Sequence, residues 1–193
     1  MLPSTLALLA SLATGVNAQS SGWRMNASVG WFDGQARTAA GVFALGPGFP
    51  LELSMERRLS RELSFDVSAL LLENVSGGSL TCQTGSTHYG EDAHSGGILA
   101  RGHYAVAGAP EKFRVSLTGG GGFFRVVRTM SCTSTPWILG DGPAVTAGLD
   151  IGLPGFWRTS PSVGAHAVRI LGLNGTHLDL FRAQLALRTR LTR

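Results

Sequence analysis

Long apolar runs are absent from this chain after its first eighteen residues. A membrane-spanning helix needs about 20 consecutive apolar residues, so a helical membrane protein is excluded. Charged residues are also scarce, at 15% of the chain, and Lys112 is the single lysine among the 16 basic residues. The arginines give a net charge of +4 but are spread along the sequence. Because no basic segment stands out, we expect no nucleic-acid binding.

The first eighteen residues have the features of a secretory signal peptide. A Leu/Ala-rich run extends from Leu6 to Ala13, and Val16-Asn17-Ala18 fits the small-x-small rule of signal peptidase. No lysine or arginine precedes the run, so the terminal amine is its only positive charge. We expect residues 1–18 to be removed and residues 19–193 to form one domain. That domain is either soluble outside the cytoplasm or crosses a membrane as strands.

The stretch from Phe49 to Leu72 shows the clearest pattern in the sequence. Apolar and polar residues alternate with a period of two on both sides of a turn near Ser60. The apolar positions are Leu51, Leu53, Met55, Leu63, Phe65, Val67, Ala69 and Leu71. A helix would also align some leucines at a spacing of four, but it would place Leu53, Phe65 and Ala69 on the polar side. The pattern therefore predicts an antiparallel hairpin.

The same two-residue period recurs in six further stretches. They are Trp23–Trp31, Ile98–Val106, Phe113–Val127, Val145–Ile151, Ser162–Ala167 and His177–Leu191. In the last stretch the phase slips near Phe181, which predicts a bulge. With the hairpin, these stretches make eight strands of about 10 residues, enough to cross a bilayer at a tilt.

The expected connections alternate in length. Those after strands two, four and six are short (Ser60-Arg61, 107–111 and 154–157), whereas those after strands one, three and five are long (33–48, 74–96 and 130–142). Short turns at one rim and long loops at the other are typical of bacterial outer-membrane barrels, with both termini on the periplasmic side.

The aromatic residues fall near the two predicted rims. Near the short turns lie Trp23, Phe65, Tyr104, Phe113 and Trp157, and near the long loops lie Trp31, Phe49, Phe123, Phe124 and Phe181. Two such belts suit the two interfaces of a membrane. We therefore predict an all-β fold, an eight-stranded antiparallel up-and-down transmembrane β-barrel in the bacterial outer membrane. The alternative is a soluble barrel or sandwich whose apolar face is covered by a lid or a second sheet.

From Trp23 to Leu191 the chain resembles the small eight-stranded outer-membrane barrels, the class that includes the transmembrane domain of OmpA. The resemblance rests on the strand pattern and on no diagnostic motif. It implies outer-membrane lipids and the barrel-assembly machinery as partners. Chains of this class usually end on an aromatic residue that this machinery reads, whereas this one ends Leu191-Thr192-Arg193.

The interior of such a barrel is just wide enough to be filled by side chains. The inward set includes Glu52, Glu56, Asp66, Arg101, His103, Arg114, Asp150, His166 and Arg188. An unpaired charge in a narrow lumen costs several kcal/mol, so we expect these acids and bases to form an ion-pair network. A small gated pore is the alternative.

Catalysis is the other alternative, because the outer-membrane lipid A deacylases and palmitoyltransferases are also eight-stranded. Such hydrolysis requires a serine beside a histidine that an acid orients. His166 is followed by Ala167 and Val168, so the His-x-Ser arrangement of the deacylases is missing, although Ser162 shares the face of His166. We assign no catalytic residue and expect a structural or surface-binding protein, with a lipid-modifying enzyme as the alternative.

Two further groups of residues could carry chemistry, one in the second long loop and one within the expected strand Phe113–Val127. His88, Glu91, Asp92 and His94 could ligate a divalent ion, but their spacing fits no specific motif, so we expect a solvated acidic loop with no metal or cofactor. Gly119 to Gly122 lack the lysine and hydroxyl residue of a phosphate-binding loop, and we attribute them to close packing or curvature in the wall.

The chain contains only two cysteines, Cys82 and Cys132, which fall in the second and third long loops. Both loops lie on the same side of the predicted barrel and flank the hairpin of strands four and five. Because an exported chain meets an oxidising compartment, we expect one Cys82–Cys132 disulfide. It would hold the two loops as one surface for an extracellular ligand.

Overall fold

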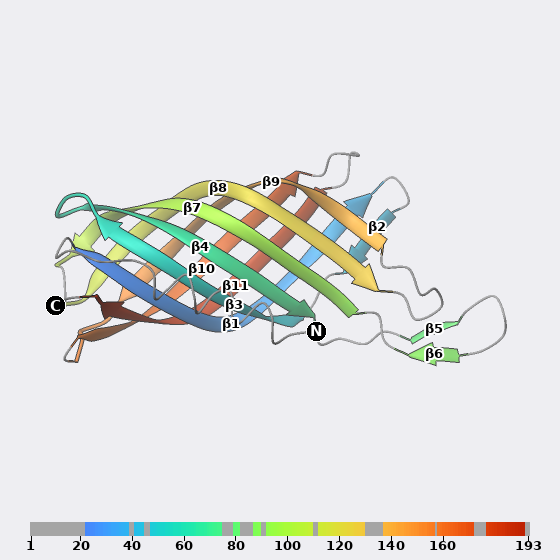
Figure 1. Ribbon diagram of the computed structural model, residues 1–193, viewed down its shortest axis with the longest axis horizontal. Helices are drawn as coiled ribbons and strands as arrows, with labels where there is room; N and C mark the ends of the chain where they lie inside the picture. The colour runs from blue at the N-terminus through green and yellow to red at the C-terminus, as the bar shows by residue number, and fades with distance from the viewer. Residues whose placement is uncertain are drawn as a thin grey trace.

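The computed structural model describes residues 22–38, 41–44, 47–74, 79–81, 87–89, 92–109, 112–129, 137–156, 158–171 and 177–191. Eight long strands in this part of the chain form a closed antiparallel barrel (Figure 1). They are β1 (Trp23–Thr38), β3 (Gly48–Arg58), β4 (Leu63–Asn74), β7 (Asp92–Gly108), β8 (Arg114–Thr129), β9 (Trp137–Gly152), β10 (Thr159–Leu171) and β11 (His177–Arg190). Each strand pairs with the next one in this order, and pairing of β11 with β1 closes the ring. The described residues include no helix that is long and apolar enough to span a membrane.

Three short strands lie at the end of the barrel opposite the short turns (Figure 1). β2 (Gly41–Ala44) pairs with the last residues of β1, and β5 (Ser79–Thr81) pairs with β6 (Thr87–Tyr89) in a separate two-stranded sheet. The barrel strands, at 11 to 17 residues, are longer than expected. Residues 137–142, for example, were expected in a loop but belong to β9, because β8 and β9 continue to pair beyond Phe124.

The outer wall of the barrel is apolar. All eight strands expose large apolar side chains, among them Val29, Leu51, Val67, Ile98, Leu117, Val145, Val163 and Leu185. Ile98, for instance, is 62% exposed, whereas the residues that alternate with these face inward and are buried. No second sheet covers this wall in the part of the chain that the structure describes. An apolar exterior around a closed ring of strands is the arrangement of a transmembrane barrel, because lipid replaces water as the solvent of the wall.

The short turns are tightly hydrogen-bonded. Between β3 and β4, the Ser60 hydroxyl accepts bonds from the backbone N–H groups of Glu62 (3.2 Å) and Leu63 (3.0 Å). β7 ends at Gly108 and β8 begins at Arg114, so the connection between them lies two residues later in the sequence than expected. β7 contains a bulge between Ala105 and Ala107, which shifts its pairing with β8.

The bulge expected near Phe181 is absent. β11 pairs with β1 and β10 in unbroken register, and its burial alternates through Leu178, Leu180 and Arg182, which all face inward. The apparent slip in the sequence arises because the inward positions at this end of β11 are apolar. Along the strand the apolar residues move from inward to outward positions, whereas the backbone keeps its regular alternation.

The interior has two layers. Near the long-loop end lies an apolar cluster, here called the plug, which consists of Phe32, Leu70, Leu72, Leu99, Phe124, Ala144, Val168, Ile170, Leu178 and Leu180. Phe124 was expected in an outer aromatic belt, but it is 0% exposed and belongs to the plug, whereas its neighbour Phe123 faces outward. Trp157 lies outside the described residues.

Glycines make room for the large inward side chains. Phe124 lies opposite Gly97 on the neighbouring strand, and a Cβ atom at Gly97 would lie 2.5 Å from the Phe124 ring. Phe32 lies opposite Gly48 in the same way, with a closest approach of 2.5 Å. In the glycine run of β8, Gly120 lies opposite Arg101 and Gly122 opposite Leu99. Gly120 and Gly122 therefore serve close packing across strands, because a Cβ atom at either would lie within 3 Å of the neighbouring strand.

We predict that Gly97→Ala lowers the free energy of unfolding by about 1–3 kcal/mol, because the added methyl group overpacks the Phe124 ring. Gly96→Ala is the matched control, since a Cβ atom there would meet nothing closer than Leu71, at an ordinary 3.5 Å. Reversible denaturant unfolding in detergent or lipid measures both. Equal losses at the two positions would contradict the assignment of Gly97 to the inner face.

Candidate functional site

Below the plug, the inward side chains are polar. The structure places the nine residues expected in the lumen there: eight are buried, and the Arg188 side chain is 13% exposed. They come from β3, β4, β7, β8, β9, β10 and β11. Alternation along the strands positions them, because every second residue of a barrel strand must point into the lumen.

Glu52 occupies the centre of this polar layer. Arg182 donates a hydrogen bond from one terminal nitrogen to Glu52 Oε2 at 2.5 Å, and Arg101 forms an ion pair with Glu52 Oε1. Arg182 is 1% exposed and was not among the expected network residues. The bulge wrongly assigned near Phe181 removed it from the inward set, although the regular alternation from Gln184 and Arg188 would have included it.

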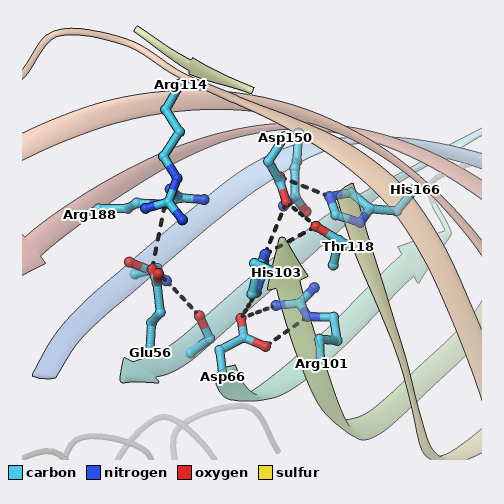
Figure 2. Close-up of polar contacts among 12 residues, drawn as sticks. Glu56, Asp66, Arg101, His103, Arg114, Thr118, Asp150, His166 and Arg188 are labelled. Carbon is cyan, nitrogen blue, oxygen red and sulfur yellow. Dashed lines mark hydrogen bonds and ion pairs between the residues drawn. The ribbon is translucent and has the colours of Figure 1, made fainter. Parts of the chain in front are cut away.

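Arg101 also binds Asp66 through a bidentate pair. Its Nε donates to Asp66 Oδ1 at 3.0 Å and a terminal nitrogen to Oδ2 at 2.6 Å (Figure 2). This geometry matches the planar fork of a guanidinium to a carboxylate and gives the strongest common type of side-chain hydrogen bond. Arg101 therefore holds two acids from two different strands at fixed positions.

His103 lies between two carboxylates (Figure 2). Its Nε2 is 3.3 Å from Asp66 Oδ2, and its Nδ1 is 3.4 Å from Asp150 Oδ2. Thr118 Oγ1 is 3.0 Å from His103 Nδ1 and donates to Asp150 Oδ2 at 2.5 Å. Two carboxylates within ion-pair distance on opposite sides of the ring suit an imidazolium, whose positive charge both of them stabilise, although Nε2 has no hydrogen-bond partner among the described residues.

His166 completes the chain of contacts, with its Nε2 3.1 Å from Asp150 Oδ1. The resulting series runs Arg182, Glu52, Arg101, Asp66, His103, Asp150, His166. It alternates between basic and acidic groups at every step and joins six strands across the lumen. Such pairing offsets the large cost of removing each charge from water, and it fixes the strands relative to one another.

The remaining three expected residues lie outside this series. Glu56 is 3.9 Å from Arg188 Nε and accepts a 3.5 Å bond from Asn26, which also donates to Ser54 at 3.1 Å. Arg114 donates to the backbone carbonyl of Glu62 at 3.1 Å. The expected single network is therefore divided, with its lower part near the short turns richer in arginine than in acid.

The polar layer leaves almost no free space. The cavity among its side chains measures about 20 Å³, which is enough for about one water molecule. A substrate or a hydrated ion has no room there. The chemistry of this layer is thus limited to charge pairing within the protein.

A serine hydrolase arrangement is also missing from the described residues. His166 directs Nε2 to Asp150, and its Nδ1 has no hydrogen-bond partner in that part of the chain. Ser162 and His166 are buried within the lumen and cannot reach a lipid outside the wall. The described residues also contain no group of three or more potential ligands that could hold a metal ion.

The expected loop features lie outside what the structure describes. Cys82, Cys132 and Glu91 are not among the described residues, and the side chains of His88, Asp92 and His94 are not described either. The disulfide therefore stays a prediction.

Comparisons with known proteins agree with the geometry. No family model and no curated protein matches the sequence. Among solved structures, the Neisserial surface protein A (NspA) aligns over 90% of this chain and 100% of its own, with a TM-score of 0.63 and 15% identity. The attachment invasion locus protein Ail of Yersinia pestis, solved with the heparin analogue sucrose octasulfate, aligns over 86% and 99%, with a TM-score of 0.56 and 11% identity. The chain therefore has the fold of the small eight-stranded outer-membrane β-barrel proteins.

Proposed function

We propose that this protein is a non-enzymatic barrel of the bacterial outer membrane that holds its long loops at the cell surface, for envelope structure or for binding an extracellular ligand. Its apolar wall contacts outer-membrane lipids, and the barrel-assembly machinery inserts it. In this orientation the short turns, the start of β1 and the end of β11 face the periplasm, as in other barrels of this architecture.

The filled interior is the observation that carries the proposal. The plug closes the lumen towards the long loops, and the paired charges below it leave only about 20 Å³ free. A barrel whose described residues leave no lumen for transport and place no accessible catalytic group in it can act through its rims and its wall. Ail, solved with a heparin analogue, is an example of this fold in a protein with a polyanionic ligand.

The orientation predicts which rim is accessible on intact cells. A cysteine at Arg37, an exposed residue near the long-loop end of β1, should react with a membrane-impermeant maleimide on whole cells. A cysteine at Ser60 in a short turn should react only after the outer membrane is permeabilised. Labelling of Ser60→Cys but not Arg37→Cys on intact cells would reverse the orientation, and recovery of the unmodified protein without detergent would refute the membrane location.

The sealed lumen predicts that the purified protein forms no stable channel in planar lipid bilayers. Replacing the two inward rings of the plug, with Phe32→Ala and Phe124→Ala together, should give brief openings at most, because it removes the bulkiest groups at that end while the packed charges below still close the lumen. Phe123→Ala is the matched control, since that ring faces outward. A steady open channel in the unmodified protein would favour the pore alternative.

The network predicts a structural role for His166. His166→Ala should lower the free energy of unfolding by about 1–3 kcal/mol, because it leaves a buried Asp150 oxygen without its partner. His177→Ala, at an exposed strand end, should have little effect. Lipid A from cells that express either variant should have the same acylation pattern by mass spectrometry. A change specific to His166→Ala would favour the lipid-modifying enzyme.

A further inference from the structure

The short-turn end of the lumen is strongly basic. Five inward arginines surround it, namely Arg24, Arg58, Arg114, Arg188 and Arg190, each placed by the alternation of its strand. They come from β1, β3, β8 and β11. The inward carboxylate among them is Glu56, which pairs across the sheet with Arg24 and lies 3.9 Å from Arg188. We call this group the basic mouth.

A cavity opens within the basic mouth. It measures about 180 Å³ and is lined by Arg24, Gly155, Arg158, Thr159, Ser160, Arg188 and Arg190. No acidic residue contributes to this lining, whereas the cavity in the central network is lined by Glu52, Asp66 and Asp150 as well as by bases. The two polar spaces of the same barrel thus differ in the residues that line them: both acids and bases line the central one, whereas the lining of the one at the mouth contains arginines and no acid.

Several guanidinium nitrogens at this end have no hydrogen-bond partner among the described residues. They are Nε and a terminal nitrogen of Arg58, Nε of Arg114 and Nε of Arg188. Arg114 is 7% exposed, so its Nε is removed from bulk water. Of these three arginines, Arg188 lines the cavity. A buried donor without a partner is costly and like charges held together repel, so an anion bound in the cavity stabilises this end of the lumen.

We propose that the basic mouth is a binding site for phosphate groups. Guanidinium groups bind phosphate oxygens in a bidentate manner, and the hydroxyl groups of Thr159 and Ser160 can donate additional hydrogen bonds from the cavity wall. A phosphate could come from a phospholipid headgroup in the inner leaflet or from a soluble phosphate compound of the periplasm. Only this choice of sources rests on the proposed orientation in the outer membrane. The binding chemistry itself does not.

The test uses the purified, folded protein in maltoside micelles, titrated with pyrophosphate by isothermal calorimetry. Arg158→Gln should weaken binding about tenfold, since it removes one charge-assisted contact from the cavity. The matched control is Arg61→Gln, which removes the same charge from an exposed turn at the same rim but does not line the cavity. The affinity of Arg61→Gln for pyrophosphate should stay within about twofold of that of the unmodified protein, because an exposed charge outside the cavity is screened by salt.

Arg24→Gln provides a second lining variant, and unchanged heat-dependent gel mobility confirms that each variant is folded. Adding phosphatidylglycerol to the micelles distinguishes the sources. Competition with pyrophosphate would support a lipid headgroup as the ligand, and pyrophosphate binding without competition would support a soluble one. Absence of binding, or equal weakening by Arg158→Gln and Arg61→Gln, would overturn the site. A detergent micelle does not separate two compartments, so these outcomes are independent of the membrane orientation that the surface-labelling experiment tests.

Discussion

The narrow lumen is the constraint on which the rest of this structure depends. Eight strands enclose a space that side chains alone must fill, so every inward charge needs a protein partner in place of water. Glu52 pairs with both Arg101 and Arg182. Asp66 and Asp150 lie on either side of His103 and pair with it. Each partner comes from a different strand. The pairs therefore fix how the strands are registered around the ring, and they leave only about 20 Å³ free in the polar layer.

The same constraint explains the distribution of glycine. A large inward group such as Phe124 or Phe32 fits only because the neighbouring strand has no side chain at the facing position, Gly97 or Gly48. Arg101 depends on Gly120 in the same way. Charge pairing and glycine packing are thus two ways of filling a narrow lumen with large side chains. The apolar plug fills the end near the long loops, and the charged residues fill the remainder towards the short turns.

Much of this fold could be predicted from the sequence, because an apolar wall and a polar lumen produce a period of two that needs no tertiary information. The hairpin of β3 and β4 is the clearest example, with its turn at Ser60. The prediction failed where the lumen itself is apolar. Leu178 and Leu180 face inward among the plug residues, so their hydrophobicity suggested a bulge that β11 does not contain, and Arg182 was lost from the network. Phe124 was misplaced for the same reason. Pairing partners such as Arg182 with Glu52, 130 residues apart, depend on ring closure, which no local pattern encodes.

The separation of the two ends has a consequence for how the protein can work. The plug and the central network lie between the long loops and the basic mouth, and both are closely packed. A signal from one rim to the other would require a second arrangement of the buried pairs, and breaking one such pair costs about 3–5 kcal/mol. That cost is a large part of the stability of a domain this size, which is about 5–15 kcal/mol. The two binding functions proposed here, at the loops and at the arginines, would therefore be independent of each other, because a rigid wall separates the two rims.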